Sequence, residues 1–290
     1  MPAPADEFLL DLRQVRRAFD DAAVGFDAAA AVHAEIRARL LERLDLVRLE
    51  PQAVLDLGAA TGHASRVLKD RYRRAHVLAF DMSLNMLRTA EAQQRWVRRF
   101  HRICGDAHSL PLRDASVDLV FSNLMLQWCN DPDAVFRELR RILRPDGLVS
   151  FTTLGPDSLQ ELRRAWAGVD GYTHVHRFID MHDLGDALMR NGFAEPVMDT
   201  ERLTITYPDL DALIRELRLS GSANVAAGRP TGLTGRHRGR QLQEAETVAV
   251  RGGVITLTLE VVYGHAWAGT LRERRSGGEA RVPLSQIGRR

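Results

Sequence analysis

The stretch VLDLGAATGHAS, residues 54–65, decides the fold of this chain. Three apolar residues around Asp56 predict a short buried strand, and the small residues after them predict a turn that leads into a helix. A strand, a glycine-containing turn and a helix in this order are typical of nucleotide-binding turns. The spacing of the glycines then decides which nucleotide fits.

That spacing argues against a dinucleotide. Counted from Gly58, the pattern G-x-G-x-x-G needs glycine where this chain has Ala60 and His63. An acid followed by glycines at alternate positions is instead typical of sites for S-adenosylmethionine (SAM), and Asp56, Gly58 and Gly62 match that pattern. Ala60 replaces the usual middle glycine, and the turn tolerates alanine if φ is negative there.

Strand-like and helical patterns alternate on both sides of this turn. The strand-like runs are 53–58, 76–81, 100–106, 117–123 and 148–154. The helical patterns are 62–73, 83–98 and 132–143, the last ended by RPDG. This alternation predicts an α/β fold with a doubly wound, Rossmann-like sheet, mostly parallel with an antiparallel strand near one edge.

Four of the predicted strands have a polar residue at their carboxyl end, namely Asp56, Asp81, Asp106 and Asn123. Ligands of such sheets bind at the carboxyl ends of the strands, where Asp81 can accept both ribose hydroxyls and Asp106 can accept an adenine amino group. Each of these acids could alternatively be a helix cap or a turn residue. The expected SAM-binding residues are Asp56, Gly58, Ala60, Gly62, Asp81, Met82, Asp106, Ala107 and Asn123.

The remaining segments extend the same unit. We expect one domain over 1–268 and a flexible tail at 269–290. Its parts are N-terminal helices at 8–46, the SAM-binding core at 51–155, a helical lid insertion at 156–195, and C-terminal strands and a helix at 196–268. Within the last part, 202–207 and 254–267 alternate like antiparallel strands, and 209–219 reads as a helix.

Composition and charge exclude several classes of function. The 290 residues carry a formal net charge of +2, which does not indicate nucleic-acid binding, and no run is long and apolar enough for a membrane span. Two cysteines match neither a disulfide framework nor a zinc site, so we expect a cytoplasmic protein without a metal. Arginine clusters at 71–74, 95–102 and 235–240 read as solvated faces or as a docking surface for an acidic partner.

Longer motifs then resemble a known family. VLDLGAATG, LAFDMSLNML, SNLMLQWC and FTTLGPDSLQEL are similar to class I SAM-dependent methyltransferases and, more narrowly, to the malonyl-acyl-carrier-protein O-methyltransferases of biotin synthesis. HRFIDMHDLGDALMRNGF, SANVAAGR and LEVVYGHAW extend the resemblance over about residues 13–268. It departs at Ala60 and at Phe26, where the family has tyrosine.

The resemblance implies methyl transfer from SAM to the free carboxylate of a malonyl thioester, on acyl carrier protein or coenzyme A. That carboxylate is ionised at neutral pH, so we expect positioning groups and no catalytic acid or base. The candidates are Arg177, His176, Gln127, Trp128 and Phe178. An acidic carrier protein would dock on Arg13, Arg16 and Arg17 or on the 229–240 loop.

Other functions stay open at this point. The same fold could methylate another acceptor, such as a quinone precursor. Sequences resembling the complex I assembly factor that hydroxylates arginine share this region. A binding protein that has lost catalysis is a third alternative, against which the retained acids argue. The sequence does not determine the oligomeric state.

Overall fold

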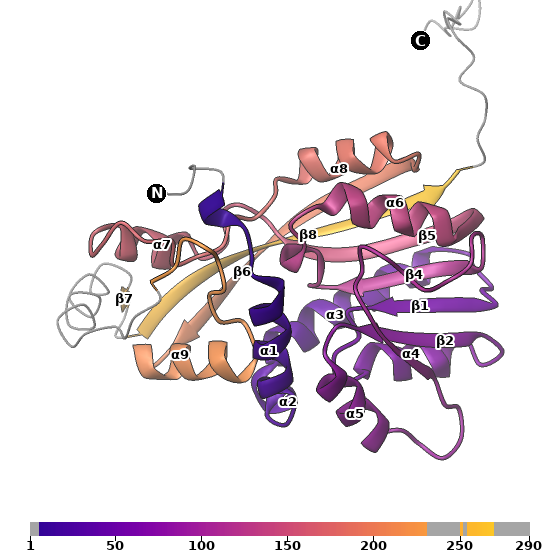
Figure 1. Ribbon diagram of the computed structural model, residues 1–290, viewed down its shortest axis with the longest axis horizontal. Coiled ribbons are helices and arrows are strands. Elements are labelled where there is room, and N and C mark those ends of the chain that lie inside the picture. The colour runs from indigo at the N-terminus through magenta and orange to yellow at the C-terminus, as the bar shows by residue number, and fades with distance from the viewer. Residues whose placement is uncertain (1–5, 231–249, 252–253, 270–290) are drawn as a thin grey trace, which may run out of the picture.

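An eight-stranded sheet forms the centre of the computed structural model, which describes residues 6–230, 250–251 and 254–269 (Figure 1). The strands are β1 Ala53–Leu57, β2 His76–Asp81, β3 His101–Cys104, β4 Val117–Asn123, β5 Leu143–Leu154, β6 Ala194–Tyr207, β7 Val250–Arg251 and β8 Val254–Ala268. Seven follow the order β3-β2-β1-β4-β5-β8-β6, and β7 pairs with β8. β1 to β5 are parallel, whereas β8 is antiparallel to β5 and β6. The sheet expected from the sequence is confirmed.

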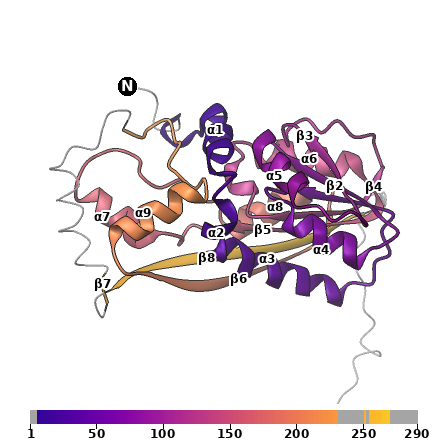
Figure 2. The same cartoon turned by 90° about the horizontal axis from the view of Figure 1, so that it is seen from below.

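Helices cover both faces of the sheet (Figure 2). Alternate residues of a strand point to opposite faces, so Val54 packs in one hydrophobic cluster and Leu55 in another. The first cluster joins the sheet to α3 Ala31–Arg43, α4 His63–Arg71 and α5 Leu84–Ala92. The second joins it to α6 Pro132–Ile142 and α8 Met181–Arg190. Burial of one large apolar side chain contributes about 1.5–3 kcal/mol, so these layers hold the strand ends in place.

A second lobe forms where β6 and β8 project beyond the other strands (Figure 1). α7 Gln160–Ala167 and α9 Leu210–Leu219 pack there around Tyr207 and Leu257. α1 Leu12–Ala22 and α2 Phe26–Ala29 contact both α9 and the main lobe. Three short 3-10 helices complete the described elements, namely η1 Asp6–Phe8, η2 Leu44–Leu46 and η3 Leu126–Trp128.

Several predicted boundaries were wrong. α5 ends at Ala92, six residues before the predicted end, and β3 is shorter than the run 100–106. The fifth strand, predicted at 148–154, begins earlier: the RPDG segment, expected to end the helix, comes just after α6 and lies inside β5, with Asp146 at φ +63°. Arg144 explains the difference, because its guanidinium donates to both carboxylate oxygens of Asp118 on β4, at 2.8 and 3.0 Å.

The expected lid divides into two parts. The apolar face of α8 packs in the core through Leu184 and Leu188, so this half of 156–195 belongs to a layer of the sheet. α7 and the segment after it, up to residue 180, line cavities instead. All but the first residue of the expected flexible tail, 269–290, and most of the 229–240 loop lie outside the described residues.

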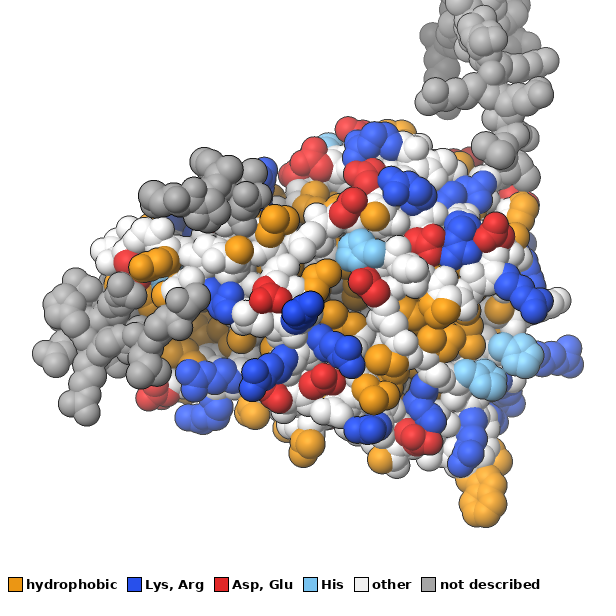
Figure 3. Space-filling view, in the orientation of Figure 1, with side chains coloured by type: hydrophobic (Ala, Val, Ile, Leu, Met, Phe, Trp, Pro, Cys, Tyr) orange, Lys and Arg blue, Asp and Glu red, His pale blue; other side chains and the backbone are white. Residues whose placement is uncertain are grey.

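The surface mixes charges of both signs (Figure 3). Two of the arginine clusters have acids beside them. In the cluster 71–74, Arg71 pairs with Asp45. In the cluster 95–102, Arg95 and Arg98 pair with Asp70, and Arg102 pairs with Glu91. These clusters therefore read as solvated faces; the third, 235–240, is not described. No helix in the described part of the chain is long and apolar enough to cross a membrane.

Candidate functional site

A strand-end pocket lies at the carboxyl ends of the parallel strands, where the order of the sheet reverses between β1 and β4. Open α/β sheets bind ligands at this point. Seven of the nine residues expected to bind SAM line it: Gly58, Ala60, Asp81, Met82, Asp106, Ala107 and Asn123. Asp56 and Gly62 lie outside the lining.

The turn after β1 runs close to the end of β2. The backbone N–H groups of Gly58 and Ala59 both donate to the carbonyl of Phe80, at 2.8 and 3.0 Å. Gly58 has φ +77°, a conformation that costs glycine nothing, and a Cβ built on it would lie 2.6 Å from the Cβ of Met125. The turn therefore has no room for a side chain at this position.

Ala60 does not meet the condition expected for it. Its φ is +46°, whereas the tolerance of alanine in the turn was expected for a negative φ. The left-handed region costs an L-residue about 1–2 kcal/mol. The Ala60 N–H donates to Asp81 Oδ2 at 2.8 Å, and its methyl group packs on a cluster that includes Phe26 and Met86. These contacts hold the strained residue in place.

Asp81 is the last residue of β2 and organises the pocket. Its Oδ2 accepts from Ala60, and its Oδ1 accepts from the N–H of Ser83 at 2.8 Å. Burial raises the pKa of Asp81 to about 6, although these hydrogen bonds act in the opposite direction. An ionised carboxylate has about four lone-pair sites, so capacity remains for ribose hydroxyls.

Asp56 lies behind the turn. It is 1% exposed, and its Oδ2 accepts from Ser65 Oγ of α4 at 2.5 Å. Burial raises the pKa of Asp56 to about 7, a rise that the Ser65 hydrogen bond opposes and the charge of Asp81 increases. Asp56 therefore joins β1 to α4 and supports the turn from below.

These two carboxyls predict how stability depends on pH. Because both folded-state pKa values lie above the unfolded value of 3.8, the folded state binds more protons than the unfolded state between about pH 4 and pH 7. The free energy of unfolding of the ligand-free protein should therefore fall as pH rises through this window, by on the order of 1–3 kcal/mol per carboxyl. Thermal melts of wild type and Asp56→Asn at about pH 5 and about pH 8 measure it. An equal pH dependence in both proteins would contradict the assignment to Asp56.

Asp106 and Asn123 occupy the other strand ends. Asp106 Oδ1 accepts from the N–H and the Nδ1 of His108, at 2.9 and 2.7 Å. Partial burial raises the pKa of Asp106, but the hydrogen bonds from His108 outweigh it and leave the pKa lowered. Asn123 accepts from Thr152 Oγ1 at 3.0 Å and donates to the carbonyl of His33 at 3.2 Å. It thus fixes the start of α3 against β4 and β5.

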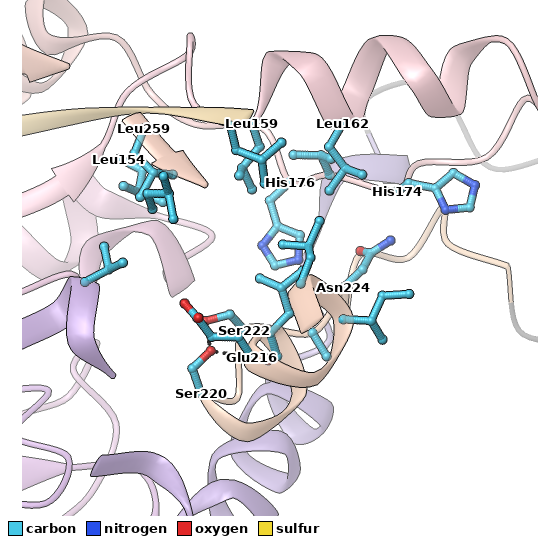
Figure 4. Close-up of a pocket in the computed structure, with 18 of the residues that line it drawn as sticks. Leu154, Leu159, Leu162, His174, His176, Glu216, Ser220, Ser222, Asn224 and Leu259 are labelled. Atoms are coloured by element: carbon cyan, nitrogen blue, oxygen red, sulfur yellow. Dashed lines mark hydrogen bonds between the residues drawn. The ribbon is translucent and has the colours of Figure 1, made fainter. Parts of the chain in front are cut away.

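An apolar chamber of about 280 Å³ adjoins the strand-end pocket. Figure 4 shows Leu159 and Leu162 on one side, Glu216 and Ser222 on the other, and His176 between them. Further apolar residues of the lining are Leu154, Leu210, Leu213, Leu217, Leu257 and Leu259. The two cavities share His33, Leu124 and Trp128, so a group passing between them would pass these three side chains.

Trp128 and His176 form an aromatic wall of the chamber. The Trp128 ring meets the rings of Phe19 and His176 edge-on, each with a centroid distance of 5.1 Å. His176 is 7% exposed, and burial lowers its pKa to about 4, so the ring is neutral. Its Nε2 accepts from the N–H of Val225 at 3.3 Å, which places the proton on Nδ1 as a donor.

An outer hollow of about 850 Å³ lies beside the chamber. The segment 170–180 and the N-terminal residues 7–10 contribute to its lining, and it shares Gln127, His176 and Phe178 with the chamber. Arg177 lines only this hollow and is exposed. Four of the five expected acceptor-site residues thus line the chamber, and Arg177 stands outside it.

Sequence reasoning missed some of the lining residues. His33 sits in a run of alanines that signals only a helix. Tyr207 and Glu216 both line the chamber and are in direct contact, with the Tyr207 hydroxyl donating to Glu216 Oε1 at 2.9 Å. Phe26 stands where the family resemblance predicts tyrosine. It is buried and lines the strand-end pocket, and its ring centroid lies 5.5 Å from that of His33.

His174 and His182, close together in the sequence, each pair with an aspartate. His174 Nε2 lies 2.8 Å from Asp170 Oδ1, and its ring stacks on Trp166 with a centroid distance of 3.6 Å. His182 Nδ1 lies 2.7 Å from Asp180 Oδ1. Within the described ranges, no three His, Cys, Asp or Glu side chains are grouped so that they could hold a metal ion.

Several known proteins are similar to this chain in sequence. A family model described as a methyltransferase domain matches residues 55–151. The malonyl-acyl-carrier-protein O-methyltransferase of Methylovorus sp. is 49% identical over 91% of this chain and 91% of its own length. That of Laribacter hongkongensis is 46% identical over 95% of this chain and 96% of its own.

Solved structures support the fold alone. The YcgJ protein of Bacillus subtilis has a TM-score of 0.58 and 20% identity, covering 80% of this chain and 98% of its own. The [4+2]-cyclase SpnF has a TM-score of 0.51 and 19% identity, covering 81% of this chain and 80% of its own. A cyclase among these neighbours illustrates that the architecture does not by itself specify the reaction.

Proposed function

Because this chain belongs to the malonyl-acyl-carrier-protein O-methyltransferase family, we propose that it methylates the free carboxylate of a malonyl thioester, with SAM as the methyl donor. The product is the malonyl methyl ester that primes pimeloyl synthesis for biotin. The observation that carries this proposal is the apolar chamber that meets the strand-end pocket at His33, Leu124 and Trp128. Such a junction brings a donor and an acceptor together.

The residues of the strand-end pocket fit SAM. Gly58 leaves the backbone of the turn bare, and a Cβ there would collide with Met125. Asp81 offers acceptors for ribose hydroxyls, and Asp106 lies beyond it for the adenine amino group. We assign Met82, Ala107 and Asn123 to the same site, while Asp56 and Gly62 support the turn.

The reaction needs little chemistry from the protein. When bound, SAM supplies a methyl group on a sulfonium: an oxygen of the malonyl carboxylate forms the new O–C bond as the S–C bond breaks, and the bonding pair stays on sulfur. No proton moves, so no side chain acts as acid or base. The chamber positions the carboxylate and excludes water, which strengthens the remaining electrostatic interactions. Gln127, Trp128, His176 and Phe178 are the side chains that we assign to this role.

A direct assay tests the proposed function. Purified protein with SAM carrying a labelled methyl group should label malonyl-acyl-carrier protein and leave acetyl-acyl-carrier protein unlabelled, because only the first has a free carboxylate. Malonyl-coenzyme A in parallel shows which carrier is preferred. Binding of SAM without labelling of any malonyl thioester would remove malonyl as the acceptor.

Arg177 was expected to position the carboxylate, but it does not line the chamber. Since it is exposed in the outer hollow, we propose that it attracts the malonyl thioester on its way to the chamber. Arg177→Ala should raise KM for malonyl-acyl-carrier protein about 3–10-fold and leave kcat unchanged, because exposed charges contribute roughly 1 kcal/mol. High salt should reduce the difference from wild type. Steady-state kinetics measure both, and an equal loss of SAM affinity would contradict this role.

The carrier protein itself needs a basic surface. Arg13, Arg16 and Arg17 lie on the exposed side of α1, where Arg16 and Arg17 make long ion pairs of 3.7 and 4.0 Å with Asp20 and Asp21. Such pairs are weak and can be exchanged for the acids of a partner. We propose α1 as one side of the docking surface. Arg229, at the start of the other candidate segment, donates to Gln14 of α1.

A further inference from the structure

His33 stands at the boundary of both cavities. It is the third residue of α3 and lines the strand-end pocket and the apolar chamber alike. Asn123 holds its backbone carbonyl at 3.2 Å, and Phe26 meets its ring edge-on. The ring is therefore held where a donor in one cavity would meet an acceptor in the other.

The ring nitrogens of His33 have capacity for a ligand. Among the residues that the structure describes, none makes a hydrogen bond to them, although other described histidines, such as His174 and His176, have such partners. Burial, assisted by the charge of Arg37 one turn along α3, lowers the pKa of His33 to about 4. The neutral ring carries one N–H donor and one acceptor.

No permanent cation lines either cavity within the described part of the chain. Neither the strand-end pocket nor the chamber has a lysine or arginine among its lining residues. The chamber offers neutral donors instead, the Nδ1–H of His176 and the amide of Gln127, whose Oε1 already accepts from Thr153 at 3.2 Å. A carboxylate in this chamber would be bound without a salt bridge.

Such a site suits a reaction that destroys charge. Methyl transfer turns a negative carboxylate and a positive sulfonium into two neutral products, so the charge on the carboxylate falls toward the transition state. A cation beside it would stabilise the substrate more than the transition state, and only interactions that are stronger in the transition state raise kcat. An apolar site with neutral donors orients the carboxylate and avoids that penalty.

We propose that His33 binds the acceptor carboxylate through its ring N–H at the junction of the two cavities, in a site that has no cation among its described lining residues. This inference rests on the proposed function and adds to it the residue that contacts the reacting carboxylate. His33 is thus a substrate-binding residue and not a base, because no proton leaves the carboxylate.

Three substitutions at one position test this role. His33→Leu removes the donor and should lower kcat/KM for malonyl-acyl-carrier protein about 10–100-fold, the range for a hydrogen bond to a charged group. His33→Gln keeps a neutral N–H donor and should retain activity within about 10-fold of wild type. His33→Arg adds a cation and should lower both KM and kcat, which a merely structural role would not produce. The exposed His101 on β3 supplies a matched control, His101→Leu, with wild-type kinetics expected.

A binding measurement separates the inference from the proposed function. Calorimetry with malonyl-coenzyme A, in the presence of S-adenosylhomocysteine, should show weaker binding to His33→Leu and tighter binding to His33→Arg, while SAM affinity stays within about 3-fold. If wild type labels malonyl thioesters and His33→Leu does so equally well, the role of His33 is wrong and the function stands. A higher kcat in His33→Arg would overturn the argument against a cation. If wild type labels no malonyl thioester, the proposed function itself fails.

Discussion

Replacement of Asp81 by alanine is expected to weaken SAM binding about 100-fold or more. The substitution removes the carboxylate and, with it, the hydrogen bonds from the ribose hydroxyls, each worth about 1.5–3 kcal/mol when the acceptor is charged. It would also leave the N–H groups of Ala60 and Ser83 without the acceptor that now holds them at 2.8 Å. Because Ala60 is already in a left-handed conformation, we expect the turn to relax away from the ligand. Calorimetric titration with SAM measures the loss.

Asp81→Asn refines this prediction. The amide oxygen can accept one of the two backbone donors, but the amide NH₂ faces the other donor, so an intermediate loss is expected. The exposed Asp45, which pairs with Arg71, provides the control Asp45→Ala with unchanged affinity. Wild-type SAM affinity in Asp81→Ala would show that the ligand does not use the end of β2.

Gly58→Ala is expected to impair both binding and folding. The added Cβ would lie 2.6 Å from both Cβ and Cγ of Met125, and the residue would hold φ at +77°. Overpacking costs about 1–3 kcal/mol, and left-handed backbone costs an L-residue about 1–2 kcal/mol more. We expect a loss of about 2–5 kcal/mol in the free energy of unfolding and a SAM affinity reduced about 100-fold. Denaturant melts and titration measure the two effects.

The control for this substitution is Gly168→Ala. Gly168 ends α7 with φ −82°, and its nearest neighbour for a new Cβ is 3.6 Å away, an ordinary contact. Stability should change by less than about 0.5 kcal/mol. If Gly58→Ala behaves like Gly168→Ala, the turn is not packed as tightly as the structure indicates, and its role in binding SAM would need another basis.

Much of the SAM-binding region was predictable from local patterns. Apolar runs of strand length identify β1, β2 and β4, and parallel strands that share a sheet end at the same edge. Asp81, Asp106 and Asn123 therefore had to lie near one another once the fold class was recognised. The family motifs added the acceptor, because the fold alone serves many reactions.

Other features were not visible in the sequence. α8 has the apolar period of any amphipathic helix, so nothing local tells whether it covers a cavity or, as observed, packs through Leu184 and Leu188 in the core. The RPDG segment was expected only to end a helix, and its place in β5 depends on pairing with β4 and β8 and on the ion pair of Arg144 with Asp118. His33 lies in a helix start that carries no motif, and its position depends on contacts from β4 and α2.

The sequence by itself determined the sheet, the turn after β1 and the acids at the strand ends, because these depend on periodicity and spacing within short segments. The tertiary structure alone decided that Ala60 has a positive φ, that Asp56 supports the turn from behind, that Arg177 stands outside the chamber and that His33 joins the two cavities. Each of these outcomes results from contacts between segments far apart in the chain. Burial and hydrogen bonding across such contacts set backbone strain, pKa and exposure, and no local pattern encodes them.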